Sequence, residues 1–348
     1  MCSSTSSSDP GAWRRFFRLA AGTAAAAVAI VYAFVVIVDP FDTLPLAPGF
    51  DRAPVASNAR FAFPALARSD RFDSALFGTS TSRLLRPAAL DPLFGTRMAN
   101  LSMNDATVHE QLRLMRVFLR AHPNPRVILL GMDVRWCVTG PDYQVYTPRP
   151  MPEWMYEDNL WVGYREMLNL YAIETAGQLF GILTGIKAET YGRDGYTRFV
   201  PPDAAYDREK VARNLRAAGP SIPPGTRSGP PETWRYPALD DLRALLADVP
   251  GETRVVLFFV PYHRVLQVSP EQEGAAVWVE CKRRAAALAA SAPGWVAVDF
   301  MRPSGITTED DHYWDALHFT TGIADRLAVG LAGAVRGERS GDYVVLGE

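Results

Sequence analysis

Short apolar runs alternate with amphipathic segments along most of the chain. Uninterrupted apolar runs are typical of strands that are buried on both faces of a parallel sheet. Five such runs, each bounded by turn residues, cover 74–77, 97–103, 126–132, 254–261 and 295–301. Apolar residues recur at helical spacing among charged ones over 108–121, 236–247, 273–292 and 320–336. This alternation predicts an α/β domain, a three-layer α/β/α sandwich with a parallel sheet.

The pattern changes near the N-terminus, where residues 19–38 are apolar and carry no charge. A helix of this length spans a bilayer core. Arg14, Arg15 and Arg18 precede it, and a positive flank predicts that the N-terminal side stays in the cytoplasm. A cleaved signal peptide is the alternative. The length of the run, and the lack of a small-x-small site before Asp39, favour a retained anchor.

Prolines and composition divide the remaining chain. Four prolines between 40 and 54 predict an extended linker over 39–70. A long, aromatic-rich segment over 137–234 interrupts the strand–helix alternation, and we expect either a functional cap or a segment packed on the sheet. The expected organisation is a cytoplasmic N-terminus at 1–18, an anchor at 19–38, the linker at 39–70, a domain at 71–336 with the insertion 137–234, and a C-terminal tail at 337–348.

Composition excludes some classes of protein. The chain has 348 residues, 48% hydrophobic, with a net charge of −2. This length accommodates one substantial core, and the balanced charge argues against a nucleic-acid binder. No Cys-x-x-Cys or His-Glu-x-x-His cluster occurs, so we predict no metal site. Cys137 and Cys281 would share an oxidising space outside the cytoplasm, where they either form a disulfide or remain buried thiols.

Three residues supply the parts of a nucleophilic relay. Ser80 lies in Gly-Thr-Ser just after the first apolar run, and Asp315 precedes His318 by three residues. A serine nucleophile, a histidine base and an orienting carboxylate form this relay, and the three-residue spacing lets the carboxylate reach the imidazole. Each has a structural alternative: Ser80 as a helix cap, and Asp315 with His318 as a brace for the last helix. His312 is a reserve base, and His263, after the fourth run, is a pocket candidate.

These motifs resemble the SGNH (GDSL-like) hydrolase superfamily. Gly78-Thr79-Ser80 is similar to its first block, with Thr in place of Asp, and Asp315 with His318 is similar to its last. The stretch 100–107 resembles the second block, with Asp105 where Gly is usual. Gly131-Met132-Asp133 resembles the third, with Asp133 in place of an Asn that donates to the oxyanion.

The resemblance makes Asn104 and Asp105 candidates for stabilising an oxyanion, the latter through its backbone N–H. Asp133 departs from the pattern because an ionised carboxylate has no hydrogen to donate. We expect Asp133 to point away, to pair with Arg135 or Arg83, or to belong to a different chemistry. The resemblance also implies that the reaction needs no cofactor.

A domain tethered in this way is similar to bacterial proteins of alginate O-acetylation and of teichoic-acid D-alanyl transfer. The resemblance implies a single-pass protein of the bacterial inner membrane with its domain on the periplasmic side. It would move an acyl group, such as acetyl, through an acyl-Ser80 intermediate to an exported or cell-surface polysaccharide. A membrane-bound acyltransferase would supply the acyl group. The alternatives are a periplasmic carbohydrate esterase and a non-catalytic SGNH-like scaffold or binding subunit of an export complex.

Overall fold

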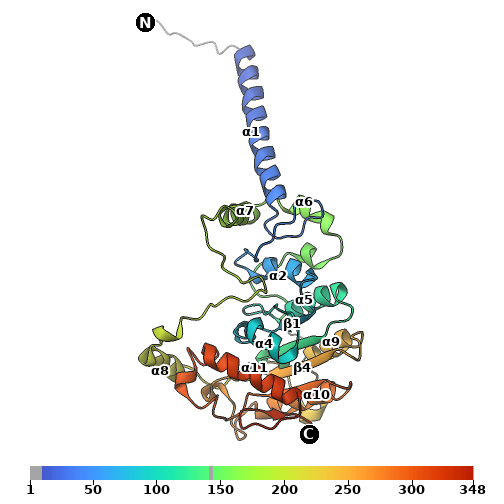
Figure 1. The fold of residues 1–348 in the computed structure, drawn as a ribbon, viewed down its shortest axis with the longest axis vertical. Helices are drawn as coiled ribbons and strands as arrows, with labels where there is room; N and C mark the ends of the chain where they lie inside the picture. The colour runs from blue at the N-terminus through green and yellow to red at the C-terminus, as the bar shows by residue number, and fades with distance from the viewer. Residues whose placement is uncertain (1–9, 141–143, 348) are drawn as a thin grey trace. The chain divides into compact units, whose positions relative to one another are not determined.

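The computed structural model describes residues 10–140 and 144–347, which form two compact units (Figure 1). One contains the residues up to Asp51 together with Asp158–Glu189. The other contains Arg52–Glu157 and the residues from Thr190 onward. Residues 1–9 of the predicted cytoplasmic segment lie outside the described part. The long insertion is therefore divided: its middle belongs with the N-terminal helix and its two ends belong with the sheet.

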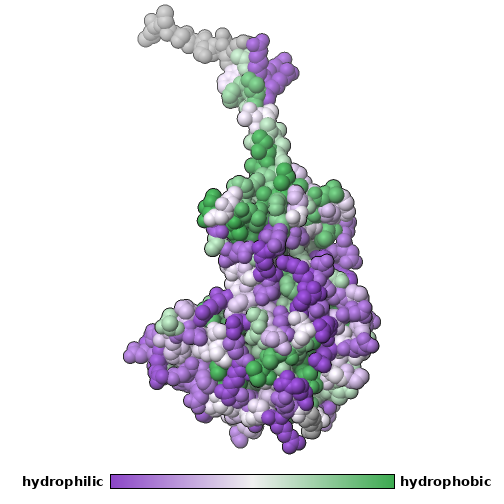
Figure 2. Space-filling view, in the orientation of Figure 1, coloured by the Kyte–Doolittle hydropathy of each residue, from purple (hydrophilic) through white to green (hydrophobic). Residues whose placement is uncertain are grey.

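The first unit is built on helix α1, Pro10–Val38. Figure 2 shows hydrophobic side chains along most of this helix and hydrophilic ones near its start. Among the described residues α1 is the one helix long and apolar enough to cross a membrane. The predicted apolar helix is therefore present, although it starts earlier than residue 19. The unit also contains η3, Leu160–Val162, α6, Gly163–Glu166, and α7, Leu170–Leu183.

Contacts made by the C-terminal half of α1 hold this unit together. The Tyr32 hydroxyl donates to the Tyr164 carbonyl at 2.9 Å, and the rings of Phe34 and Phe180 meet edge to face. After α1, the Asp39 carboxylate accepts hydrogen bonds from the backbone N–H groups of Thr43 and Leu44, both at 2.8 Å. Bonds of this kind replace the helical ones that end with α1, and they fix the chain's exit from the helix.

Within the described residues, the second unit contains a six-stranded sheet in the order β2-β1-β3-β4-β5-β6. Neighbouring strands from β2 to β5 are parallel, and β6 pairs antiparallel with β5. The strands are β1 Ser74–Phe77, β2 Met98–Asn100, β3 Val127–Met132, β4 Arg254–Phe259, β5 Val296–Asp299 and β6 Val344–Val345. All five predicted strands are present, and the mostly parallel α/β sheet is confirmed.

The helices of this unit follow the predicted alternation. They are α2 Ala59–Arg68, α3 Ser80–Arg83, α4 Pro87–Phe94, α5 Val108–Ala121, α8 Arg208–Ala217, α9 Pro237–Leu246, α10 Ala275–Ala289 and α11 Thr321–Val335. Helices α5, α9 and α10 contact one another in series, and α4 contacts α11. Helix α5 begins where predicted because Thr107 and Glu110 form a capping box at its N-terminus.

Two predicted boundaries are wrong. The linker expected over 39–70 contains α2, which starts after the cap Asn58 and packs on α5. Arg60 of α2 pairs with Glu110 in the interior, with Nε and Oε1 2.9 Å apart. The tail expected over 337–348 contains β6, which extends the sheet at its edge. Apolar residues at helical spacing form α2 despite its internal Pro64, and β6 is too short to produce a pattern of its own.

Candidate active site

Ser80 lies where β1 ends and α3 begins. Gly78, the first residue after the strand, has φ 146°, a conformation that favours glycine because a side chain would be strained there. A Cβ on Gly78 or Gly131 would overlap the Ser82 side chain, which lies between them. The two glycines therefore let the Ser80 turn pack closely against the end of β3.

The structure brings together the three residues predicted to form the relay. The Ser80 Oγ and the His318 Nε2 are 2.8 Å apart, and the His318 Nδ1 and the Asp315 Oδ2 are also 2.8 Å apart. An ionised carboxylate can only accept a hydrogen bond, so Asp315 fixes the proton of the neutral ring on Nδ1. Nε2 is then free to accept the Ser80 hydroxyl proton. This geometry is that of a nucleophile, a base and an orienting acid.

Asp315 is held in its ionised form by its surroundings. Burial alone would raise its pKa, but the hydrogen bond and charge of His318, together with the backbone N–H groups of Leu317 and His318, bring the pKa below the ordinary value. Both N–H groups donate to Oδ1 at 2.8 Å. One carboxylate oxygen therefore shapes the loop, and the other orients the imidazole.

The loop that carries Asp315 and His318 is braced from two sides. Tyr313 and Phe319 form a short antiparallel bridge across it, and the Tyr313 hydroxyl donates to the Pro261 carbonyl at 2.9 Å. The His263 backbone N–H donates to the Ala316 carbonyl at 3.0 Å. The chain that follows β4 therefore supports the relay loop, although it supplies no member of the relay.

Neither of the two other candidate histidines joins the relay. The His263 ring is buried, with Nε2 3.2 Å from the Asp310 carboxylate, and burial lowers its pKa. It caps η6, Arg264–Leu266, so it braces the structure rather than lining the relay. The Nδ1 of His312, the reserve base, is 3.0 Å from the Ile306 carbonyl, a bond that gives this ring a structural partner.

The second block runs beside the Ser80 turn. The Met103 N–H donates to the Gly78 carbonyl at 3.0 Å, which brings the next two residues, Asn104 and Asp105, to the same edge of the sheet. Asp105 has φ 54°, the left-handed conformation that a glycine usually adopts, and its carboxylate forms an ion pair with Arg135. Asp105 thus has a backbone geometry that usually favours glycine. The Asn104 Oδ1 is buried without a hydrogen-bond partner among the described residues.

Asp133 does not form either predicted side-chain ion pair. Its Oδ2 accepts a hydrogen bond from the Thr79 hydroxyl at 2.8 Å, and its Oδ1 accepts one from the Arg135 backbone N–H at 2.9 Å. The Arg135 guanidinium instead pairs with Asp105. Burial raises the pKa of Asp133, against the lowering effect of its hydrogen bonds. The carboxyl is therefore hydrogen-bonded to Thr79, the residue that precedes Ser80.

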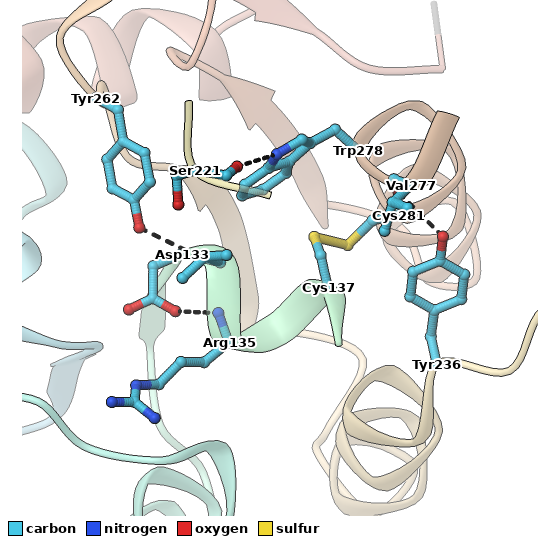
Figure 3. The surroundings of a disulfide bond; sticks show 10 residues. Asp133, Arg135, Cys137, Ser221, Tyr236, Tyr262, Val277, Trp278 and Cys281 are labelled. Carbon is cyan, nitrogen blue, oxygen red and sulfur yellow. Dashed lines mark hydrogen bonds between the residues drawn. A yellow bond between two sulfur atoms is a disulfide. The ribbon is translucent and has the colours of Figure 1, made fainter. Parts of the chain in front are cut away.

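The turn after Asp133 is joined covalently to α10. It forms η1, Val134–Cys137, and the structure contains a Cys137–Cys281 disulfide with a Cα–Cα distance of 5.5 Å (Figure 3). The Val134 N–H donates to the Tyr262 hydroxyl at 3.2 Å, close to the same turn. The disulfide fixes the segment that follows β3, and Asp133 is the first residue of that segment.

Two residues that the sequence did not single out as members of the site lie beside the relay. The Phe199 ring meets the His318 ring edge to face, with their centroids 5.5 Å apart. The Arg83 guanidinium lies 5.7 Å from the centroid of Phe199 and 5.2 Å from that of Tyr191. The only available signal was the position of Arg83, three residues after Ser80 on one helical turn.

No group of three or more potential metal ligands clusters within the described ranges 10–140 and 144–347. In the comparisons with known proteins, no family model matches the chain, and no curated protein matches it. Any function for this chain therefore rests on the local geometry of the Ser80 site.

Proposed function

We propose that this chain is an SGNH-type serine acyltransferase tethered to a membrane by α1. One observation carries the proposal: the hydrogen-bonded series Ser80–His318–Asp315, built from residues far apart in sequence. The helix contacts support a three-layer α/β/α sandwich, with α5, α9 and α10 on one face of the sheet and α4 with α11 on the other. The carboxyl ends of β1 and β3, next to the Ser80 turn, are where such sheets bind ligands.

The proposed reaction has two transfers. His318 Nε2 takes the Ser80 proton while Oγ attacks the acyl carbonyl of an ester or thioester, and the leaving alcohol or thiol takes that proton from the imidazolium. A hydroxyl of the acceptor then gives its proton to His318 and attacks the acyl-Ser80 ester. The acceptor gains the acyl group, and Ser80 recovers its proton. Asp315 stabilises the imidazolium in both steps.

The oxyanion formed in each step needs hydrogen-bond donors. The Ser80 N–H is at the start of α3, and the Asp105 N–H comes from a backbone conformation suited to a close approach. We assign the oxyanion to these two backbone donors, with the Asn104 amide as a third candidate.

The proposed location is the bacterial inner membrane, with the sheet domain on the periplasmic side. The apolar α1 supports one span, and the Cys137–Cys281 disulfide supports an oxidising space outside the cytoplasm. The acceptor would be an exported or cell-surface polysaccharide. A membrane-bound acyltransferase would be the partner that delivers the acyl group, as the resemblance to alginate O-acetylation and D-alanyl transfer proteins implies.

The test uses the full chain in detergent micelles and a fluorophosphonate probe. We expect the probe to label wild type and the control Ser291→Ala, to leave Ser80→Ala unlabelled, and to label His318→Ala at least about a thousandfold more slowly. Loss of the His318 base removes the activation of Oγ. A wild type that resists the probe and turns over p-nitrophenyl acetate no faster than Ser80→Ala would move the scaffold alternative to the front.

An acceptor requirement separates the transferase from the esterase, because both use the same residues. We expect acyl turnover to rise when an oligosaccharide acceptor is added, and the acceptor to gain the mass of the acyl group. Release of free acid at the same rate with and without acceptor would identify an esterase instead.

A further inference from the structure

A buried arginine lies on the same helical turn as Ser80. Arg83 is 4% exposed, and its Nε is buried with no hydrogen-bond partner in the described part of the chain. Among residues 10–140 and 144–347 its side chain has no ion pair or hydrogen bond, and two aromatic rings lie within cation–π distance of its guanidinium. A guanidinium stays protonated in proteins, so this turn holds a permanent charge away from water.

Two aromatic rings flank the Arg83 charge without neutralising it. Tyr191 is nearly buried and Phe199 is partly exposed, and both lie within cation–π distance of the guanidinium. Such contacts offset only part of the desolvation cost of a buried charge, and an anion with matching hydrogen bonds offsets much more. The guanidinium carries a planar fork of N–H groups that is suited to a bidentate oxyanion.

The carboxylates of the site already have other partners. Asp315 is bonded to His318, Asp133 to Thr79, and Asp105 to Arg135. Arg83 is held in place from the other side, because the Asn100 amide donates to the carbonyls of Arg83 and Leu85 at 3.1 and 2.8 Å. The geometry thus presents an oriented cation that no carboxylate of the site neutralises.

Phe199 connects this cation to the chemistry, since the same ring contacts both Arg83 and His318. We propose that Arg83 binds an anionic oxyacid group of the acceptor, a carboxylate or a phosphate, next to the acyl-Ser80 ester. This inference rests on the proposed function and adds the substrate class: a negatively charged molecule rather than a neutral sugar. Phe199 and Tyr191 would align the guanidinium with that group.

The test measures binding rather than turnover, in full-length Ser80→Ala protein in detergent micelles. The probes are methyl glucoside, methyl glucuronide and methyl glucoside 6-phosphate, titrated by calorimetry. We expect at least one anionic probe to bind about tenfold or more tighter than the neutral one, because hydrogen bonds to an ion are the strong ones. The preferred anion distinguishes the carboxylate from the phosphate.

Three variants in the Ser80→Ala background locate the effect. Arg83→Gln should abolish the preference for the anion, and Arg83→Lys should keep only part of it, because an ammonium lacks the planar fork. Arg254→Gln, which removes an exposed charge at the amino end of β4, should keep the full preference. The melting temperature of each variant shows whether it is folded, and Arg83→Lys carries the test if Arg83→Gln is not.

Two results would overturn the inference: equal binding of neutral and anionic probes, or an anion preference that survives both Arg83 changes. Because binding does not need the nucleophile, this result is independent of the phosphonate test. An Arg83-dependent preference in a protein whose Ser80 resists the phosphonate would sink the acyltransferase proposal and leave the anion site intact.

Discussion

Two segments near the Ser80 turn each carry an aspartate, and the pKa values of the two aspartates are shifted in opposite directions. In the relay loop, residues 312–320, Asp315 accepts hydrogen bonds from the His318 ring and from two backbone N–H groups. These bonds lower its pKa against the effect of burial. In the turn after β3, residues 133–137, Asp133 accepts hydrogen bonds from the Thr79 hydroxyl and from one backbone N–H, and burial raises its pKa. Asp133 is the more deeply buried of the two, and only Asp315 has a histidine beside it; both differences act in the observed direction.

The protonation state of Asp133 decides whether its carboxyl can donate a hydrogen bond. An ionised carboxylate could not donate to an oxyanion, but a protonated one carries an O–H donor, as an asparagine amide carries N–H donors. The environment of Asp133 favours that neutral form, whereas the environment of Asp315 favours the charged form that an imidazolium needs. Aspartate thus occupies two electrostatically different environments at the same site.

Replacing each aspartate by asparagine gives the largest expected contrast. Asp315→Asn removes the charge that supports the imidazolium and should lower kcat/KM about 10³–10⁴-fold. Asp133→Asn keeps an acceptor for Thr79 and should change kcat/KM by less than about tenfold, because the neutral amide resembles the favoured neutral acid. Turnover of p-nitrophenyl acetate by the full-length variants measures both.

Wild-type folding of each variant, checked by circular dichroism, is the control for this pair. Equal losses in the two variants would contradict the division of roles. A large loss in Asp133→Asn alone would place Asp133, rather than Asp315, in the relay.

Reduction of the Cys137–Cys281 disulfide should destabilise the turn at 133–137 more than the relay loop. A bond that spans 144 residues stabilises the folded state by roughly 2–5 kcal/mol, mainly by restricting the unfolded chain. The turn at 133–137 is fixed by this bond, whereas the relay loop is held by hydrogen bonds such as that from His263 to Ala316. Hydrogen exchange after reduction should therefore accelerate first at 133–137. Faster exchange at 312–320 instead would mean that the loop depends on the disulfide.

The pH dependence of stability should differ in sign between the two aspartates, with shifts of a few degrees. Burial raises the pKa of Asp133, which gives stability that is complete below the unfolded pKa, about 4, and is lost as pH rises. Wild type should therefore weaken relative to Asp133→Asn as pH rises above about 4. The lowered pKa of Asp315 gives stability that is present above about pH 4 and lost as pH falls.

Thermal unfolding at a series of pH values measures both differences. We expect melting-temperature shifts of about 2–4 °C for each kcal/mol. A wild type that gains on Asp133→Asn as pH rises would show that the Asp133 carboxyl prefers to be charged.

The parts of the fold that carry a local pattern could be predicted from the sequence. Strand β1 and helix α5 have the predicted bounds, because a short apolar run between turn residues and a capped amphipathic segment are both local signals. Helix α2 was missed because prolines dominated the interpretation of 39–70, although Ala59, Phe63 and Leu66 recur on one helical face. Two-residue β6 forms only because β5 offers it an edge.

The candidate site likewise contains residues that a sequence pattern identifies and residues whose surroundings depend on the fold. Spacing in the sequence was enough to select Ser80, Asp315 and His318, which the structure brings into hydrogen-bonding contact. No sequence pattern predicts that Arg83 is buried, because its burial depends on Tyr191 and Phe199 from a segment more than a hundred residues away. The partner of Asp133 was also unpredictable, since it depends on how closely the two glycines bring β1 and β3 together.

The distance in sequence between Ser80 and His318, 238 residues, has a consequence for how the protein is made. Chains are synthesised from the N-terminus, so the serine leaves the ribosome long before the histidine. Until the last strand-to-helix connection has arrived and docked on the chain after β4, the serine has no base and behaves as an ordinary alcohol. The order of residues along the chain therefore delays reactivity until folding is nearly complete.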